Sequence, residues 1–210
     1  MKTKMKTRVF LPLLTIAIVF VGCTKDSTAP ETVITATITE LDAQAESFTP
    51  NPPPAPPTIT GDYTKFSFSE GKEVSGDNWD VAFRNTSIII NGGYASNQEQ
   101  PTRIGNAAVY IANGTMGDVS SIDETLLMQD NSNVTAIIDD MGIQQMGWCV
   151  YDMTTNIISP IAGKILVFKT HDNKYAKMEI LNFYDSPMTN QYGGFYTFNY
   201  VYQSDGGTAF

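Results

Sequence analysis

Apolar and polar residues alternate with a period of two along most of residues 61–210. Successive side chains of a β-strand point to opposite faces, so this alternation predicts strands with one buried face. The segments that carry the pattern are Tyr63–Phe68, Trp79–Phe83, Ser87–Ile90, Ala107–Ile111, Trp148–Tyr151, Ile165–Lys169, Tyr175–Tyr184 and Phe195–Tyr202. Turn-forming residues separate them, as at Gly92-Gly93. The pattern therefore predicts one antiparallel all-β domain.

One segment of this domain departs from the two-residue period. Residues Ile122 to Gln129 predict a short helix, because Asp123 and Glu124 suit the positive end of a helix dipole. No internal repeat is visible, and residues 61–210 are of the length of a single domain.

Residues 23–60 have a different character and predict a tether. Val33 to Thr39 is β-branched and alternating, which favours one strand within the tether. The proline-rich run from Pro50 to Pro57 favours an extended, stiff segment.

The N-terminus carries a basic leader, an apolar run and a small-residue processing site, Val21-Gly22-Cys23. The apolar run from Val9 to Val21 is too short to span a bilayer, and the whole resembles a bacterial lipoprotein signal in residues 1–22. Cleavage before Cys23 would leave that cysteine as the lipidation site. Thr24-Lys25-Asp26 resembles the surface-export signal of Bacteroidetes lipoproteins, so we expect a lipid anchor on the outer face of the outer membrane.

The charge balance argues against nucleic acid as a partner. Removal of residues 1–22 takes away four basic groups and leaves 9 Lys and Arg against 22 Asp and Glu, a formal net charge of −13. Phosphates would be repelled by this charge. After acylation of Cys23 only Cys149 remains, which excludes an internal disulfide, and we interpret Cys149 as an inert buried thiol.

Catalytic patterns are hard to find in this sequence, and we expect the protein not to be an enzyme. The single histidine, His171, excludes sites built from two or three histidines, and its place in a hairpin turn favours a solvated turn residue. Asp139 and Asp140 are adjacent and would point to opposite faces of a strand, so they do not predict a glycosidase pair. Phosphate loops and the common hydrolase motifs are absent.

Methionine is the side chain that stands out. The mature chain has seven, at positions 116, 128, 141, 146, 153, 178 and 188. Met178 alternates with apolar residues on one strand face and predicts a core residue. Met128 and Met153 each end an ordered segment directly before a polar turn. A thioether in such a place can bind a soft metal or haem iron, although spacing alone is also compatible with ordinary rim methionines.

The order of the strands and their amino-acid sequences resemble those of the HmuY family of Bacteroidetes haem-binding lipoproteins, or haemophores. The most specific segment is Asn78-Trp79-Asp80-Val81-Ala82-Phe83. The other matching segments are Tyr63–Gly71, Asn91–Gly93, Gly105–Val109, Pro160–Lys169, Tyr175–Tyr184 and Phe195–Tyr202. The resemblance implies an all-β fold likened to a hand, with haem gripped between loops and bound axially by two side chains. It also implies a TonB-dependent outer-membrane haem receptor as partner.

The resemblance also implies ligand positions, and this chain has no histidine at either. The downstream ligand of the family follows an aromatic strand, here Trp148 to Asp152, so Met153 takes its place. The upstream ligand falls in the variable middle, where Met128 is preferred and the alternatives are Met116, Met141 and Met146. Some relatives are similar in using methionine pairs. Neutral thioethers stabilise ferrous over ferric haem, so we expect a raised reduction potential.

Two other functions stay open at this point. A surface glycan-binding or adhesin lipoprotein would use exposed aromatic side chains such as Tyr192, Phe195 and Tyr196 and would bind no haem. A structural subunit of an outer-membrane receptor would expose a large apolar patch.

Overall fold

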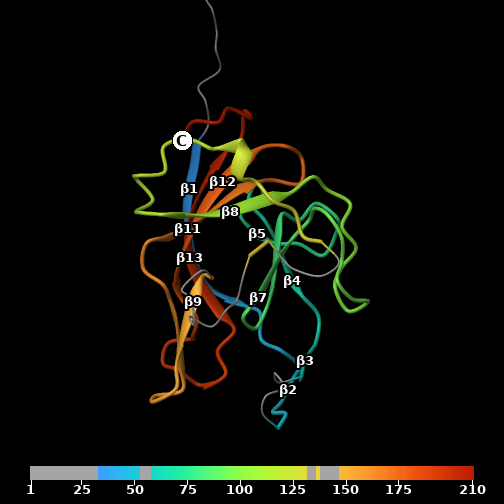
Figure 1. Cartoon of the computed structure of the whole chain (residues 1–210), viewed down its shortest axis with the longest axis vertical. Coiled ribbons are helices and arrows are strands. Elements are labelled where there is room, and N and C mark those ends of the chain that lie inside the picture. The colour runs from blue at the N-terminus through green and yellow to red at the C-terminus, as the bar shows by residue number, and fades with distance from the viewer. Residues whose placement is uncertain (1–32, 53–57, 132–135, 138–146) are drawn as a thin grey trace, which may run out of the picture. The chain divides into compact units, whose positions relative to one another are not determined.

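Antiparallel strands make up nearly all of the regular structure that the computed structural model describes, namely in residues 33–52, 58–131, 136–137 and 147–210 (Figure 1). The largest sheet has five strands in the order β1-β13-β12-β11-β8, and all neighbouring pairs are antiparallel. Its strands are β1 (Val33–Asp42), β13 (Phe195–Gln203), β12 (Tyr175–Asn182), β11 (Lys164–Lys169) and β8 (Ala108–Asn113). This arrangement confirms the predicted fold class.

A second sheet has four strands in the order β5-β4-β6-β7, and two hairpins complete the strands. Their bounds are β5 (Lys72–Glu73), β4 (Thr64–Ser67), β6 (Val81–Arg84) and β7 (Ser87–Ile90) for the sheet, with β2 (Ser47–Thr49) and β3 (Thr58–Thr60), and β9 (Cys149–Asp152) and β10 (Ile157–Pro160), for the hairpins. No helix in the described part of the chain has the length and apolar character that crossing a bilayer requires.

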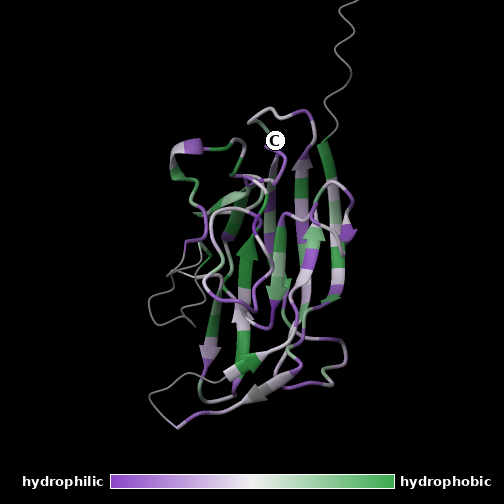
Figure 2. Ribbon diagram, turned by 90° about the vertical axis from the view of Figure 1, so that its right-hand side faces the viewer, coloured by the Kyte–Doolittle hydropathy of each residue, from purple (hydrophilic) through white to green (hydrophobic). Residues whose placement is uncertain are grey.

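The main core lies between the two large sheets and is rich in aromatic rings. Alternate residues of β13 are buried, which turns Tyr196, Phe198 and Tyr200 toward the core. Phe198 meets Phe66 of β4 edge to face, with ring centroids 5.3 Å apart. Such buried side chains contribute roughly 1.5–3 kcal/mol each through burial of apolar surface. Figure 2 shows the apolar residues along the strands and the polar ones mainly in the connections.

The outer face of the five-stranded sheet carries a smaller core, covered by the segment after β8 and by the C-terminal residues. Phe210 donates its backbone N–H to the Ser120 carbonyl at 3.0 Å. Beneath them Lys177 donates its Nζ to the carbonyls of Met116 and Val119. Burial lowers the pKa of Lys177. The segment and the C-terminus are thereby fixed to the sheet.

The helix predicted from Ile122 to Gln129 is a single 3-10 turn, η1 (Glu124–Leu126). Asp123 caps this turn, because its carboxylate accepts the backbone N–H of Thr125 at 3.0 Å. The chain is extended again at Leu127. Met128 then exchanges two backbone hydrogen bonds with Val109 of β8, so its backbone is unavailable to continue a helix.

The strand predicted inside the tether is β1, the edge of the five-stranded sheet. It pairs with β13 from Val33 opposite Gln203 to Asp42 opposite Phe195. The folded body therefore includes β1, and the boundary predicted at residue 61 lies inside it. The signal segment 1–22, Cys23 and Pro53–Pro57 lie outside the described residues.

Candidate functional site

The β9–β10 hairpin presents the predicted ligand Met153 at its tip. Asp152 lies opposite Ile157 at the last pair of the hairpin, and Asn156 closes the turn by donating its N–H to the Asp152 carbonyl at 2.7 Å. Asn156 adopts a left-handed backbone conformation with φ +59°, which asparagine tolerates better than most residues. The tip is therefore a short, closed turn of Met153, Thr154 and Thr155.

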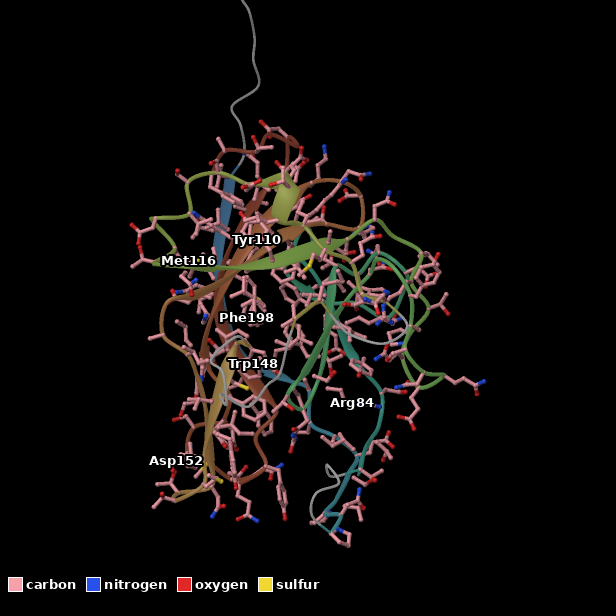
Figure 3. All side chains as sticks on the ribbon, viewed as in Figure 1. Arg84, Tyr110, Met116, Trp148, Asp152 and Phe198 are labelled. Atoms are coloured by element: carbon pink, nitrogen blue, oxygen red, sulfur yellow. The ribbon has the colours of Figure 1, made fainter. Side chains whose placement is uncertain are left out.

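Side chains reinforce this turn. The Asp152 carboxylate accepts the N–H of Thr154 at 2.7 Å and the hydroxyl of Thr155 at 3.0 Å, and these hydrogen bonds lower the pKa of Asp152. The Tyr151 hydroxyl donates to the Asn156 side-chain oxygen at 2.6 Å. Asp152 is the residue labelled at the lower end of the hairpin in Figure 3.

Met153 is 83% exposed, the largest fraction among the exposed large apolar side chains of the described residues. A methionine usually fills gaps in a core, and its removal from water would be favourable. A turn that holds this side chain in solvent gives up that gain. The thioether is thus displayed as a neutral, soft sulfur donor on a hydrogen-bonded support.

The base of the hairpin is tied into the core. The Trp148 indole N–H donates to the Thr86 carbonyl at 3.1 Å, and the N–H of Ile158 donates to the Tyr184 hydroxyl at 2.9 Å. Cys149 is fully buried, as predicted. Tyr184 follows the Asn182 end of β12, so the hairpin belongs to that end of the five-stranded sheet.

Met128 belongs to the opposite end of the same sheet. Its backbone partner Val109 lies opposite Phe168, next to the pair of Lys169 with Tyr175, where β12 begins. The eight residues of β12 rise by roughly 23 Å along the strand. Met128 is 56% exposed. The structure therefore does not bring Met128 and Met153 together.

The alternative ligands fall in two groups. Met116 is half-buried against the smaller core, far from the hairpin tip in Figure 3, and its carbonyl accepts from Lys177. Met141 and Met146 lie outside the described residues, as do Asp139 and Asp140. Met178 is fully buried, which confirms its assignment to the core.

One exposed methionine near the hairpin escaped the sequence analysis. Met188 lies directly before Thr189 and Asn190, so it meets the criterion that selected Met153, a methionine before a polar turn. It is 51% exposed and follows Tyr184, the residue that binds the hairpin base. Leu181 is also exposed at this end of β12. The Asn182 end of the sheet thus displays several apolar side chains to solvent.

His171 is not the solvated turn residue that the sequence predicted. Its Nδ1 lies 2.8 Å from Oδ1 of Asp80, whose side chain is 2% exposed, and its backbone N–H donates to the same oxygen at 2.9 Å. The hydrogen bond to the Asp80 carboxylate raises the pKa of His171 above its ordinary value, although partial burial opposes the shift. The prediction failed because Asp80 is 91 positions away in sequence.

Asp80, His171 and Asp172 offer ligand atoms within 4.8 Å of one another. The Asp80 carboxylate is already committed, however, since its second oxygen accepts the N–H of Phe68 at 2.8 Å. Phe68 follows β4, and His171 lies in the turn after β11. The group therefore joins the two large sheets, and its geometry is that of a structural contact.

The aromatic side chains expected of a glycan-binding surface are not all available. Tyr196 is fully buried and donates its hydroxyl to the Asn85 carbonyl at 2.5 Å. Phe195 is half-buried, and Tyr192 is exposed. These three residues do not form the predicted exposed set.

Two hollows of the surface lie away from the methionines. One of about 410 Å³ is lined by Tyr63, Lys65 and Glu99 among others, and one of about 370 Å³ by Tyr94 and Arg103 among others. No methionine lines either hollow. They do not coincide with the proposed ligands.

Comparison with solved structures finds several similar chains. A protein from Bacteroides fragilis described as a lipoprotein is 12% identical, with a TM-score of 0.48 over 83% of this chain and 93% of that one. A protein from Bacteroides vulgatus described as HmuY-like and haem binding is 15% identical, with a TM-score of 0.46 over 81% and 92%. The apo form of an HmuY analogue from Tannerella forsythia is 13% identical, with a TM-score of 0.47 over 82% and 97%.

Sequence comparison gives the assignment. Among proteins with curated functions none matches this chain. The sequence model of the HmuY protein family matches residues 60–200, which is more than half of the 210 residues. The match includes the Asn78 to Phe83 segment and all strands from β4 to β12. The chain therefore belongs to the HmuY family.

Proposed function

We propose that this protein binds haem and that the Met153 thioether is one axial ligand of the iron. The observation that carries the proposal is the exposed sulfur on the hydrogen-bonded tip of the β9–β10 hairpin, in a chain of the HmuY family. Apolar side chains at the same end of the sheet, Leu181 and Met188, would contact the porphyrin.

The protein would act at the cell surface. Acylation of Cys23 would anchor it to the outer face of the outer membrane, and the haem would pass to a TonB-dependent outer-membrane receptor for iron acquisition. The supporting features are Val21-Gly22-Cys23 and the Lys25-Asp26 pair in the sequence, together with the family assignment.

The second ligand is proposed among four methionines. Met128 is preferred from the sequence, but two axial ligands share one iron, so Met128 can pair with Met153 only if the hairpin and the segment after η1 approach each other. Met116, Met141 and Met146 are the alternatives. Single substitutions of each residue distinguish them.

The oxidation state of the iron gives the proposal its sharpest consequence. Thioether sulfur is soft and uncharged, so it stabilises Fe(II) more than Fe(III). We expect tighter haem binding under dithionite than in air. The reduction potential of the complex should lie above that of a bis-histidine haem protein.

The test is a haem titration of the full chain and of Met153→Leu, followed by the Soret and visible bands in the oxidised and reduced states. Leucine keeps the apolar character and removes the sulfur. We expect the low-spin ferrous spectrum to be lost in this variant. Met188→Leu is the matched control. It also removes an exposed thioether at the same end of the sheet, but leucine keeps the apolar contact proposed for this position, so the spectrum should be kept.

Two results would count against the proposal. A wild-type protein with no Soret shift in either state would contradict haem binding and leave surface glycan binding as the alternative. An unchanged ferrous spectrum in Met153→Leu would remove Met153 from the site while leaving haem binding intact. The substitutions at positions 116, 128, 141 and 146 would then identify the ligands.

A further inference from the structure

The two edge strands of the five-stranded sheet, β8 and β1, differ in whether another segment covers their outer backbone groups. The outer edge of β8 is covered, because Val109 exchanges backbone hydrogen bonds of 2.9 and 3.0 Å with Met128, and the Gln129 side chain donates to the Ala107 carbonyl. Among the residues that the structure describes, none covers the outer edge of β1 in this way. Within the described residues, β13 is the only strand that pairs with Val33–Ile38. Figure 2 shows β1 at the right-hand margin of the sheet.

An uncovered edge of this length is unusual for a soluble domain. Free N–H and C=O groups along an edge strand are a template for another strand, and proteins usually block them with lysine, proline or a bulge. β1 contains no lysine, arginine or proline. Its one irregularity is the register shift after Ile38, where Glu40 has φ +53°. Six consecutive residues before it are regular and open.

The sequence of this open stretch is a palindrome. Ile34-Thr35-Ala36-Thr37-Ile38 reads the same in both directions. Two copies of one strand that pair antiparallel around Ala36 therefore place identical residue types opposite each other. Ile34 faces Ile38 of the second copy on the side of the core, and Thr35 faces Thr37 on the exposed side. Threonine pairs and β-branched pairs across strands are favourable.

We propose that β1 is a self-association edge, and that two copies of this chain pair their β1 strands antiparallel around Ala36 to form one continuous ten-stranded sheet. The interface is two-fold symmetric, as closed dimers of identical chains usually are. A shift of the centre to Thr37 would place Ile34 opposite the charged Glu40, so the centre at Ala36 is favoured. This proposal does not depend on haem binding.

Disulfide trapping tests the register in the full chain in detergent solution. A chain carrying Thr35→Cys should cross-link to a chain carrying Thr37→Cys, because directly opposed residues have Cα atoms about 4.5–5.5 Å apart, within the range of a disulfide. Two chains carrying Thr39→Cys are the control. Their cysteines would lie roughly 20 Å apart and should not cross-link.

Charge exchange tests the same pairs without a covalent bond. Thr35→Lys with Thr37→Lys places lysine opposite lysine twice and should give a monomer by light scattering. Thr35→Lys with Thr37→Glu places opposite charges together and should restore the dimer. Both double variants lose the hydrogen bond from Thr37 to the Asn199 side chain, so this loss does not distinguish them.

A monomeric wild type at its highest soluble concentration would overturn the proposal. Equal molar masses of the two charge variants, or cross-linking of Thr39→Cys as efficient as that of the Thr35 and Thr37 pair, would overturn it as well. If the variant with lysine at both positions fails to fold, the cross-linking experiment and the variant with Thr35→Lys and Thr37→Glu still test the proposal. Pairing of β1 with a different protein would appear as monomeric pure protein.

Discussion

The two ends of β12 differ in what they bury. At the Tyr175 end polar and charged side chains lie inside the protein and bind segments that are distant in sequence. At the Asn182 end Met153 lies in solvent on a turn whose hydrogen bonds are local. The difference separates two tasks of the chain. Buried polar groups that find their partners hold one arrangement of the sheets, whereas exposed apolar groups cost stability and indicate recognition.

The buried polar groups at the Tyr175 end form three connected contacts. Asn91 accepts the backbone N–H groups of Ile104 and Gly105 and donates to two carbonyls. Arg103 and Asp130 form an ion pair of 3.2 Å in which both side chains are 1% exposed. Asp80 holds His171, and the His171 carbonyl accepts the N–H of Asn106. Each group thus fixes a loop whose residues are distant in sequence.

Within the described residues, the tip of the β9–β10 hairpin at the Asn182 end has no comparable network of long-range hydrogen bonds. The hydrogen bonds of the β9–β10 tip are local, joining Asp152 to residues two to four positions away. They shape the turn and leave Met153 in solvent. Substitutions at this end should therefore change ligand binding, and substitutions at the other end should change stability.

The largest effect is expected for Asp80→Asn. The carboxylate accepts three hydrogen bonds, from the N–H of Phe68 and from the N–H and Nδ1 of His171, and it is buried. An amide removes the charge and turns a donor toward these donors. Breaking a buried charged pair costs about 3–5 kcal/mol. Urea denaturation of the full chain measures the loss.

Asp152→Asn is the matched control at the other end. Its carboxylate also accepts several hydrogen bonds, but it is exposed, and the unfolding midpoint should hardly move. Equal losses in the two variants would contradict the contrast between the ends of β12.

Met178→Ala and Met153→Ala should give opposite results. Met178 is fully buried in the main core, so its truncation leaves a cavity and costs about 2–5 kcal/mol. The protein that remains folded should keep its haem spectrum. Met153→Ala should keep the unfolding free energy and lose the ferrous spectrum. A shared loss of spectrum and stability in either variant would show that the two roles are not separate.

The strands were the part of the fold that the sequence predicted well, because the alternation of one buried face is a local signal. Ser87–Ile90 matches β7 at both ends, and the long segments match β11, β12 and β13 to within one or two residues. The largest difference among these three is at β12, which ends at Asn182, two residues before the predicted end at Tyr184. The strands β2, β3 and β5 were not predicted because two or three residues carry too little periodicity. Strand β10 was not predicted because Ile157-Ile158-Ser159-Pro160 does not alternate.

That β1 is an edge strand of the five-stranded sheet was not predicted, for a different reason. Its alternation was recognised, but the proline-rich run that follows it separates it from the other strands in sequence, which favoured a tether. Only its pairing with β13, more than 150 positions away, places it in the sheet. Such long-range pairing has no local signature.

For the candidate site, too, local features were predicted from the sequence and long-range ones were not. Met153 at a hairpin tip follows from the strand and turn pattern, and the exposure of its side chain agrees with that interpretation. The distance between Met128 and Met153 could not be predicted, because it depends on which end of the sheet each segment joins. The contact of His171 with Asp80 could not be predicted either, because the two residues are 91 positions apart in sequence.

The smallest effect concerns His171→Gln. Glutamine keeps a side-chain donor near Asp80 but carries no charge, so the loss should not exceed that of one charge-assisted hydrogen bond, about 1.5–3 kcal/mol. The loss falls below that of Asp80→Asn because the backbone N–H of His171 still donates to Asp80. A solvated turn residue, as the sequence predicted for His171, would show no such loss.

The dependence of this loss on pH identifies its origin. Asp80 and Asp172 face the imidazole, and the nearby Tyr202, whose pKa burial raises to about 12, stays neutral over the range. The hydrogen bond to Asp80 raises the pKa of His171 in the folded protein above 6.5, so its contribution is complete below pH 6.5 and is lost as the pH rises through the raised value. Wild type and His171→Gln should therefore differ more in unfolding free energy at pH 6 than at pH 9. A difference that stays constant across these urea denaturations would mean that His171 contributes through packing alone.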